Sequence, residues 1–193
     1  MPPAPGSVAA QAELDIVLQV QAWRTPEQVA WAQRVEKDSV YNQPEIVGAW
    51  FTPENLPRTA AFFKDIGDDL RAFDAAAKKP FLRPRPSAVD PAVRPCVTVP
   101  ASTSYPSGSG MQAQVWAELL AELFPEKRDA LLDRAQRAGW GRVIGGVHFP
   151  SDIVAGRLIA RAYFEECRKH AAFRDALEAC RREVAQFGAK KPG

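Results

Sequence analysis

The segment GRVIGGVHFPSD, residues 141–152, carries the most informative chemistry in this chain. Its proline, Pro150, suits the first turn of a helix, so we expect a helix to begin there. Asp152 follows His148 by four residues, close enough for its carboxylate to hold and polarise the imidazole ring. A single histidine is more often structural than catalytic, so this segment by itself leaves both interpretations open.

Two earlier segments add polar chemistry. Residues 78–86, KKPFLRPRP, are basic and rich in proline, a composition most often typical of a solvated linker. Residues 105–110, YPSGSG, stand directly before a helical pattern. A Ser/Gly turn at a helix N-terminus presents free backbone amides to an anion, although its ordinary interpretation is a capped helix start.

The three segments together match a known signature in order and in internal spacing. They resemble the superfamily of phosphatidic acid phosphatases type 2 (PAP2) and vanadium haloperoxidases, in particular its soluble bacterial class A non-specific acid phosphatases. The matching residues are Lys78 with Arg85-Pro86, then Pro106-Ser107-Gly108, then Arg142 with His148 and Asp152. Two positions differ from the signature: Ser109 stands where it has histidine, and Gly141 stands where it has serine.

The resemblance implies a phosphatase that hydrolyses phosphomonoesters or phosphoanhydrides through a phosphohistidine. By matched position it implies a phosphate-binding set made of Lys78, Arg85, Ser107, Gly108 and Arg142. It implies a catalytic set in which His148 attacks phosphorus, Asp152 fixes its tautomer and Ser109 occupies the place of the general acid. No metal and no cofactor are implied; vanadate would act as an inhibitor or, in a haloperoxidase, as the cofactor.

Ser109 decides how much of that activity to expect. Positioned acid–base groups contribute roughly 10² to 10⁴-fold to a rate, and a serine hydroxyl cannot exchange protons unaided near neutrality. The other histidine, His170, is expected to lie far along the helix that follows His148. The sequence thus predicts turnover that depends steeply on the leaving group, whereas a flat dependence would mean that another acid is present. Three functions stay open: a hydrolase of good leaving groups, a non-catalytic phosphoester binder and a vanadate-dependent haloperoxidase.

The fold predicted for the chain is all-α, a single-domain helical bundle of the PAP2 and haloperoxidase type. Residues 1–24 are expected to form an N-terminal extension and residues 25–193 the domain, with motifs at 78–86, 106–109 and 141–152. Apolar periodicity predicts helices over 58–79, 111–123, 125–139, from Pro150 onward and over 171–187, with residues 80–100 as a long loop. Thr25-Pro26 and Thr52-Pro53 suit helix starts, and Phe63, Ile66, Leu70 and Phe73 suit one buried stripe.

Composition limits the partners. A net charge of +2 over 193 residues gives no reason to expect a nucleic-acid surface, so the expected partner is a small phosphoester, with a homo-oligomer as an open alternative. No apolar run approaches the roughly 18 residues of a membrane span. The N-terminus does not have the pattern of a secretory signal, which predicts a soluble cytoplasmic protein, or a periplasmic or secreted one whose signal was removed.

Two side-chain groups allow more than one interpretation. The three cysteines, Cys96, Cys167 and Cys180, lack metal-ligand spacing; the last two could pair across packed helices or stay free. The aromatic residues of segment 15–57 could stack on a substrate or belong to the core.

Overall fold

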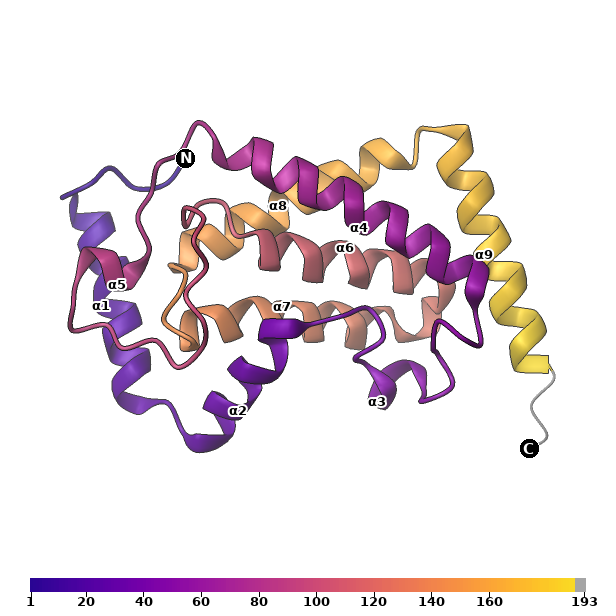
Figure 1. The fold of residues 1–193 in the computed structure, drawn as a ribbon, viewed down its shortest axis with the longest axis horizontal. Helices are drawn as coiled ribbons and strands as arrows, with labels where there is room; N and C mark the ends of the chain where they lie inside the picture. The colour runs from indigo at the N-terminus through magenta and orange to yellow at the C-terminus, as the bar shows by residue number, and fades with distance from the viewer. Residues whose placement is uncertain (190–193) are drawn as a thin grey trace.

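The computed structural model describes residues 1–189, and this part of the chain is helical with no β-strand (Figure 1). Its α-helices are α1 (Val8–Trp23), α2 (Pro26–Arg34), α3 (Pro44–Val47), α4 (Pro57–Lys78), α5 (Pro86–Val89), α6 (Gly108–Leu123), α7 (Arg128–Ile144), α8 (Pro150–Cys167) and α9 (Ala171–Ala189). Two 3-10 turns, Val35–Lys37 and Pro125–Lys127, connect neighbouring helices. The prediction of an all-α fold is confirmed.

Helix α6 is the centre of the molecule. It packs along both α7 and α8, while α4 crosses above it and α9 closes one end (Figure 1). Val115, Leu119 and Leu120 on α6 have no exposed surface at all. A helix that is apolar nearly all round must be surrounded by other helices, and this fixes α6 inside the bundle with its N-terminus beneath the loops of residues 80–107.

The two predicted helix starts have different outcomes. Thr25 caps α2 with a capping box shared with Gln28, as the sequence predicts. The expectation at Thr52 is wrong, because its hydroxyl accepts a hydrogen bond from the amide of Asn55 and closes a turn instead. Helix α4 begins only at Pro57, where Glu183 from α9 accepts hydrogen bonds from the first free amides of the helix.

Helix α7 continues past Gly139, where the sequence predicts its end, and reaches Ile144. The glycines in its last turns serve close packing. A Cβ on Gly139 would lie 2.8 Å from Cγ2 of Ile153, and one on Gly141 would lie 2.7 Å from Cγ2 of Val35. This extension carries Arg142, in the last turn of α7, to the same end of the bundle as the start of α6.

The buried stripe on α4 is shorter than predicted. Phe63, Ile66 and Leu70 are buried, but Phe73 is 40% exposed, with its ring next to that of Tyr163 of α8. The reason is that α4 extends beyond the bundle near its C-terminus, so its last turns face the loops and the solvent.

Residues 80–100 form a long connection with one helical turn, α5, inside it. This connection and the N-terminal helix share a small apolar cluster: Leu14 and Val17 of α1 pack with Val93, Val143, Phe149 and Ile153. Helix α1 thus lies directly against the loop that carries His148.

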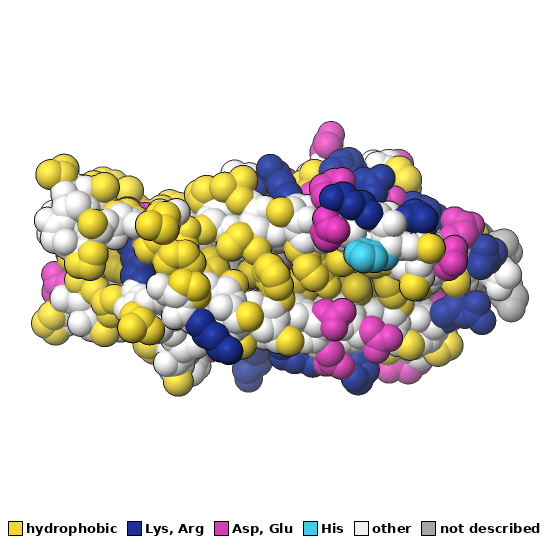
Figure 2. Space-filling view, turned by 90° about the horizontal axis from the view of Figure 1, so that it is seen from above, with side chains coloured by type: hydrophobic (Ala, Val, Ile, Leu, Met, Phe, Trp, Pro, Cys, Tyr) yellow, Lys and Arg dark blue, Asp and Glu magenta, His cyan; other side chains and the backbone are white. Residues whose placement is uncertain are grey.

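Surface chemistry differs between the two ends of the molecule. Figure 2 shows charged side chains gathered over the half that ends in α9, and more apolar ones over the half near α1. Leu82, Val154 and Leu158 are large apolar residues with exposed side chains. Within residues 1–189 no helix is both long and apolar enough to cross a membrane.

All three cysteines are free thiols, and of the two alternatives for Cys167 and Cys180 the structure has the unpaired one.

Candidate active site

A cavity of about 290 Å³ lies where the three sequence segments meet. Six of the eight predicted site residues line it: Lys78, Arg85, Gly108, Ser109, Arg142 and His148. Each lies at a helix end or in a loop held by the bundle, namely the last turns of α4 and α7, the first turn of α6 and the loops before α5 and α8. Ser107 and Asp152 do not line the cavity but lie directly behind it, with no exposed surface.

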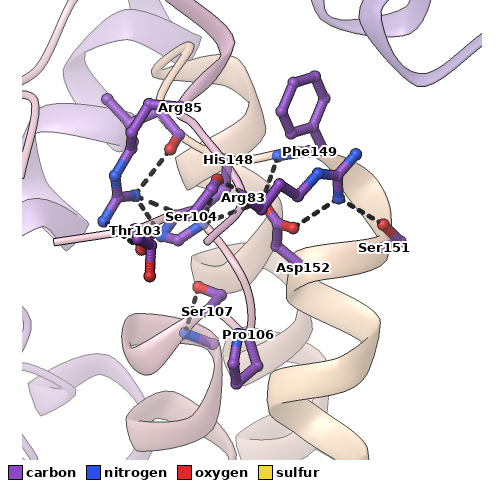
Figure 3. A network of polar contacts seen from close by, with 12 residues as sticks. Arg83, Arg85, Thr103, Ser104, Pro106, Ser107, His148, Phe149, Ser151 and Asp152 are labelled. Atoms are coloured by element: carbon purple, nitrogen blue, oxygen red, sulfur yellow. Dashed lines mark hydrogen bonds and ion pairs between the residues drawn. The ribbon is translucent and has the colours of Figure 1, made fainter. Parts of the chain in front are cut away.

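The imidazole of His148 has distinct partners on its two nitrogens (Figure 3). Its Nδ1 lies 3.3 Å from Oδ2 of Asp152, and its Nε2 lies 3.0 Å from Nη1 of Arg85. A guanidinium can only donate, so Nε2 accepts and Nδ1 carries the proton that faces the carboxylate. The lone pair of Nε2 is therefore directed to the cationic side of the cavity.

His148 is neutral over most of the pH range. Burial lowers its pKa from 6.5 to about 4, although the hydrogen bond with Asp152 acts in the opposite direction. The neutral ring is the form with a free electron pair, so a buried histidine of this kind stays nucleophilic in acidic solution.

Asp152 is fully buried and accepts on both oxygens. Its Oδ2 accepts from the hydroxyl of Ser104 at 2.6 Å and from the amide of Phe149 at 2.9 Å, and its Oδ1 accepts from Nη1 of Arg83 at 2.7 Å (Figure 3). Burial alone would raise the pKa of Asp152, but the hydrogen bond with His148 and the charge of Arg83 lower it below its usual range. The carboxylate stays ionised and fixes the imidazole in one orientation.

Arg83 extends this network to the N-terminal helix. Its Nη2 lies 2.7 Å from Oε2 of Glu13 on α1, and its guanidinium stacks over the ring of Phe149 at 4.0 Å. Glu13 also accepts from the amide of Ser151 at 2.6 Å, in the first turn of α8. The orientation of the histidine thus depends on contacts that reach from the cavity to residue 13.

The two arginines of the cavity differ in their hydrogen bonds. Arg85 donates to the carbonyls of Ser102, Thr103 and Val147, and burial lowers its pKa to about 10, so it keeps its charge near neutrality. Arg142 is 5% exposed, and its Nε and Nη1 find no acceptor within the described chain. Buried donors without a partner cost about 1–3 kcal/mol, so Arg142 is ready to bind an anion.

The N-terminus of α6 forms the floor of the cavity. Ser107 caps this helix: its Oγ accepts from the amide of Gly110 at 3.1 Å, which leaves the first-turn amides of Gly108 and Ser109 without an intrahelical acceptor. Lys78 stands opposite, with Nζ 2.7 Å from Oδ1 of Asp74 and bonded to the carbonyl of Pro106. Four cationic side chains, those of Arg71, Lys78, Arg85 and Arg142, therefore line one small space together with a helix N-terminus.

Sequence comparison agrees with this geometry. The profile of the PAP2 superfamily matches residues 70–168, about half of the chain and all three motifs. The chain belongs to the PAP2 superfamily. Proteins named non-specific acid phosphatase are similar to it: one from Salmonella typhimurium is 32% identical over 144 residues, and one from Providencia stuartii is 32% identical over 140 residues. These alignments cover 72% and 70% of this chain but 58% and 55% of those proteins, so this PAP2 chain spans little more than half of their length.

The PAP2 fold is also found in a solved structure. The crystal structure of the first transmembrane PAP2 type phosphatidylglycerolphosphate phosphatase from Bacillus subtilis aligns with a TM-score of 0.51. The alignment covers 83% of this chain and 89% of that one at 23% identity, so it supports the bundle architecture alone.

Several residues of this PAP2 site cannot be selected from the motifs. Arg83 lies in the basic segment, yet nothing in the pattern separates its role from that of Arg85 two positions later. Glu13 and Ser104 lie outside every motif. Asp74 had a detectable signal, because it stands four residues before Lys78 on the same helix face. The aromatic residues of segment 15–57 are placed elsewhere: none of them lines the cavity, and Phe51 is buried in the core.

Proposed function

We propose that this PAP2 chain is a phosphatase that hydrolyses phosphomonoesters or phosphoanhydrides through a phosphohistidine on His148. The observation that carries the proposal is the arrangement of His148 itself. Its Nε2 faces a cavity lined by four cationic side chains, while its Nδ1 is held by a buried carboxylate. The names of the Salmonella and Providencia relatives point to the same activity.

The first half of the reaction would proceed as follows. Lys78, Arg85 and Arg142, with the amides of Gly108 and Ser109, neutralise the charge on the phosphoryl oxygens. Nε2 of His148 then attacks phosphorus in line with the ester oxygen, and the P–O bond breaks. Asp152 stabilises the positive charge that develops on the ring, because its carboxylate stays ionised beside Nδ1. In the second half, water attacks phosphorus and returns the electron pair to Nε2.

Residues 1–189 contain no group of three or more His, Cys, Asp and Glu side chains placed to hold a metal ion. The proposal therefore draws on arginine, lysine and backbone amides for charge neutralisation. Vanadate, which adopts the trigonal bipyramidal shape of the five-coordinate phosphoryl state, is expected to bind in the same cavity and inhibit.

The test compares the native chain with His148→Ala on nitrophenyl phosphate, with His170→Ala as the matched control because this histidine is exposed in the turn after α8. Native and control chains should turn over alike, and His148→Ala should lose at least about 10²-fold. A phosphoryl group trapped by acid-free quenching should be stable to base and labile to acid, as expected for phosphohistidine. Equal rates for the native chain and His148→Ala would refute the proposal.

A phosphoester binder without turnover is the second candidate, and Ser109 is the observation that favours it. Tight binding of phosphate together with equal activity of the native and His148→Ala chains would support the binder. Vanadate-dependent bromination would instead support a haloperoxidase.

A further inference from the structure

A carboxylate outside the three motifs lies in the phosphate cavity. Asp74, on α4, lines the cavity with its side chain 28% exposed. Its carboxylate packs onto the first turn of α6: a Cβ on Gly108 would lie 2.6 Å from Cγ and Oδ1 of Asp74. Gly108 therefore leaves room for a carboxyl group directly beside Ser109.

The proposed reaction needs a proton donor on the leaving-group side, and few side chains qualify. A serine hydroxyl at position 109 cannot supply the proton, and His170 is exposed beyond the end of α8. Glu36 also lines the cavity, but hydrogen bonding from Thr98 lowers its pKa, which favours its charged form. Asp74 is the remaining carboxyl group in the cavity.

We propose that Asp74 is the general acid and base of this site, in the place that Ser109 leaves empty. This inference rests on the proposed phosphatase function. In the first half, Nε2 of His148 forms a bond to phosphorus, the electron pair of the breaking P–O bond stays on the ester oxygen, and that oxygen takes the carboxyl proton of Asp74. In the second half, the Asp74 carboxylate takes a proton from water, the water oxygen bonds to phosphorus, and the P–N electron pair returns to Nε2. The products are an alcohol and phosphate, and Asp74 regains the proton that it gave.

The charges around Asp74 are compatible with both halves. In the free cavity its Oδ1 is paired with Lys78 at 2.7 Å, and Arg71 of the same helix lines the cavity next to it. The charge of Asp74 also acts on Arg85, from the opposite loop, and raises the pKa of that guanidinium. A bound phosphoryl dianion attracts these cations to itself, which releases the carboxyl group of Asp74 from its ion pair with Lys78 for proton exchange. The free amides of the α6 first turn face the same space and interact with the phosphoryl oxygens rather than with the carboxyl proton.

A carboxyl group at Asp74 changes the leaving-group dependence that the sequence predicts. With Ser109 as the sole candidate, turnover should depend steeply on the leaving group. With Asp74 as a proton donor, the native chain should hydrolyse phosphate esters of alcohols nearly as readily as those of phenols.

The experiment measures kcat/KM for a series of phosphate monoesters, from nitrophenyl to alkyl leaving groups, with the native chain and Asp74→Asn. The variant keeps the shape of the side chain and removes its titratable proton. We expect a loss of about 10² to 10⁴-fold on alkyl esters and only a few-fold loss on nitrophenyl phosphate. Asp65→Asn, an exposed position on the same helix, is the matched control and should behave as the native chain.

The double variant Asp74→Asn/Ser109→His separates a proton-transfer role from a positioning role. A histidine at position 109 should restore at least part of the alkyl ester activity that Asp74→Asn loses, whereas it cannot restore a mispositioned Lys78. If circular dichroism shows that Asp74→Asn is unfolded, Asp74→Ser replaces it and is assayed with and without added formate. Formate should then raise the rate on alkyl esters.

The outcomes distinguish the two proposals. A loss that is equal for all esters, or no loss at all, would overturn the role of Asp74 and leave the phosphatase intact. A native chain no more active than His148→Ala on any ester would overturn the phosphatase and, with it, this inference.

Discussion

The neutral state of His148 predicts a specific pH dependence of stability. The pKa of this histidine is about 4 in the fold, whereas an unfolded chain has the ordinary value of 6.5. Between these two values the unfolded state binds more protons than the folded state, so the free energy of unfolding rises with pH and is lost as the pH falls. From about pH 7 down to about pH 5, this one group should cost the fold about 2 kcal/mol.

The assay is urea unfolding at both pH values for the native chain, His148→Gln and the control His170→Gln. The free energy of unfolding differs between pH 7 and pH 5, and this difference should be about 2 kcal/mol smaller in His148→Gln than in the native chain. In the control it should equal that of the native chain. Carboxylates that do not contact His148 cancel in this comparison. A proton NMR titration of the His148 ring gives an independent measurement. A midpoint near 6.5, or equal pH dependence in all three chains, would refute the argument that a neutral, buried imidazole is the nucleophile.

Two further predictions concern the support of the site. Arg83→Leu leaves the carboxylate of Asp152 without its buried ion-pair partner, so it should lower the free energy of unfolding, measured in urea, by about 3–5 kcal/mol. The control Arg34→Leu removes an exposed ion pair and should lower it by less than about 1 kcal/mol. In Gly156→Ala the new methyl group would meet the carbonyl oxygen of Ser107, so we expect the free energy of unfolding to fall by about 1–3 kcal/mol. Added phosphate should also raise the Tm of this variant less than that of the native chain. An unchanged response to phosphate would contradict that packing.

The fold was largely predictable because its helices carry clear apolar periodicity. The errors arose where glycine and proline have more than one use. Gly139 reads as a helix stop in sequence, but in the bundle it makes room for Ile153. Thr52-Pro53 reads as a helix start, but the hydroxyl closes a turn because the acceptor for the α4 amides is supplied by Glu183, more than a hundred residues away.

The candidate site was predictable only as far as its motifs extend. Lys78, Arg142 and His148 meet in one cavity, as their spacing implies. Arg83 and Glu13 could not be found this way, because their importance comes from tertiary contacts between segments with no local pattern in common. Asp152 was found because it stands at a fixed spacing from His148, whereas Arg83 and Glu13 needed a three-dimensional structure to be recognised.

The contact between Glu13 and Arg83 has a consequence for His148, the proposed nucleophile. Glu13, Arg83 and Asp152 form a row of alternating charge that ends on the neutral ring of His148, so a change of charge at Glu13 reaches the ring through Arg83 and Asp152. Neutralising Glu13 would free Arg83 to bind Asp152 more strongly, and a carboxylate held more strongly is a weaker acceptor for the imidazole. A helix outside the matched segment 70–168 thus influences the electron pair on Nε2 of the proposed nucleophile.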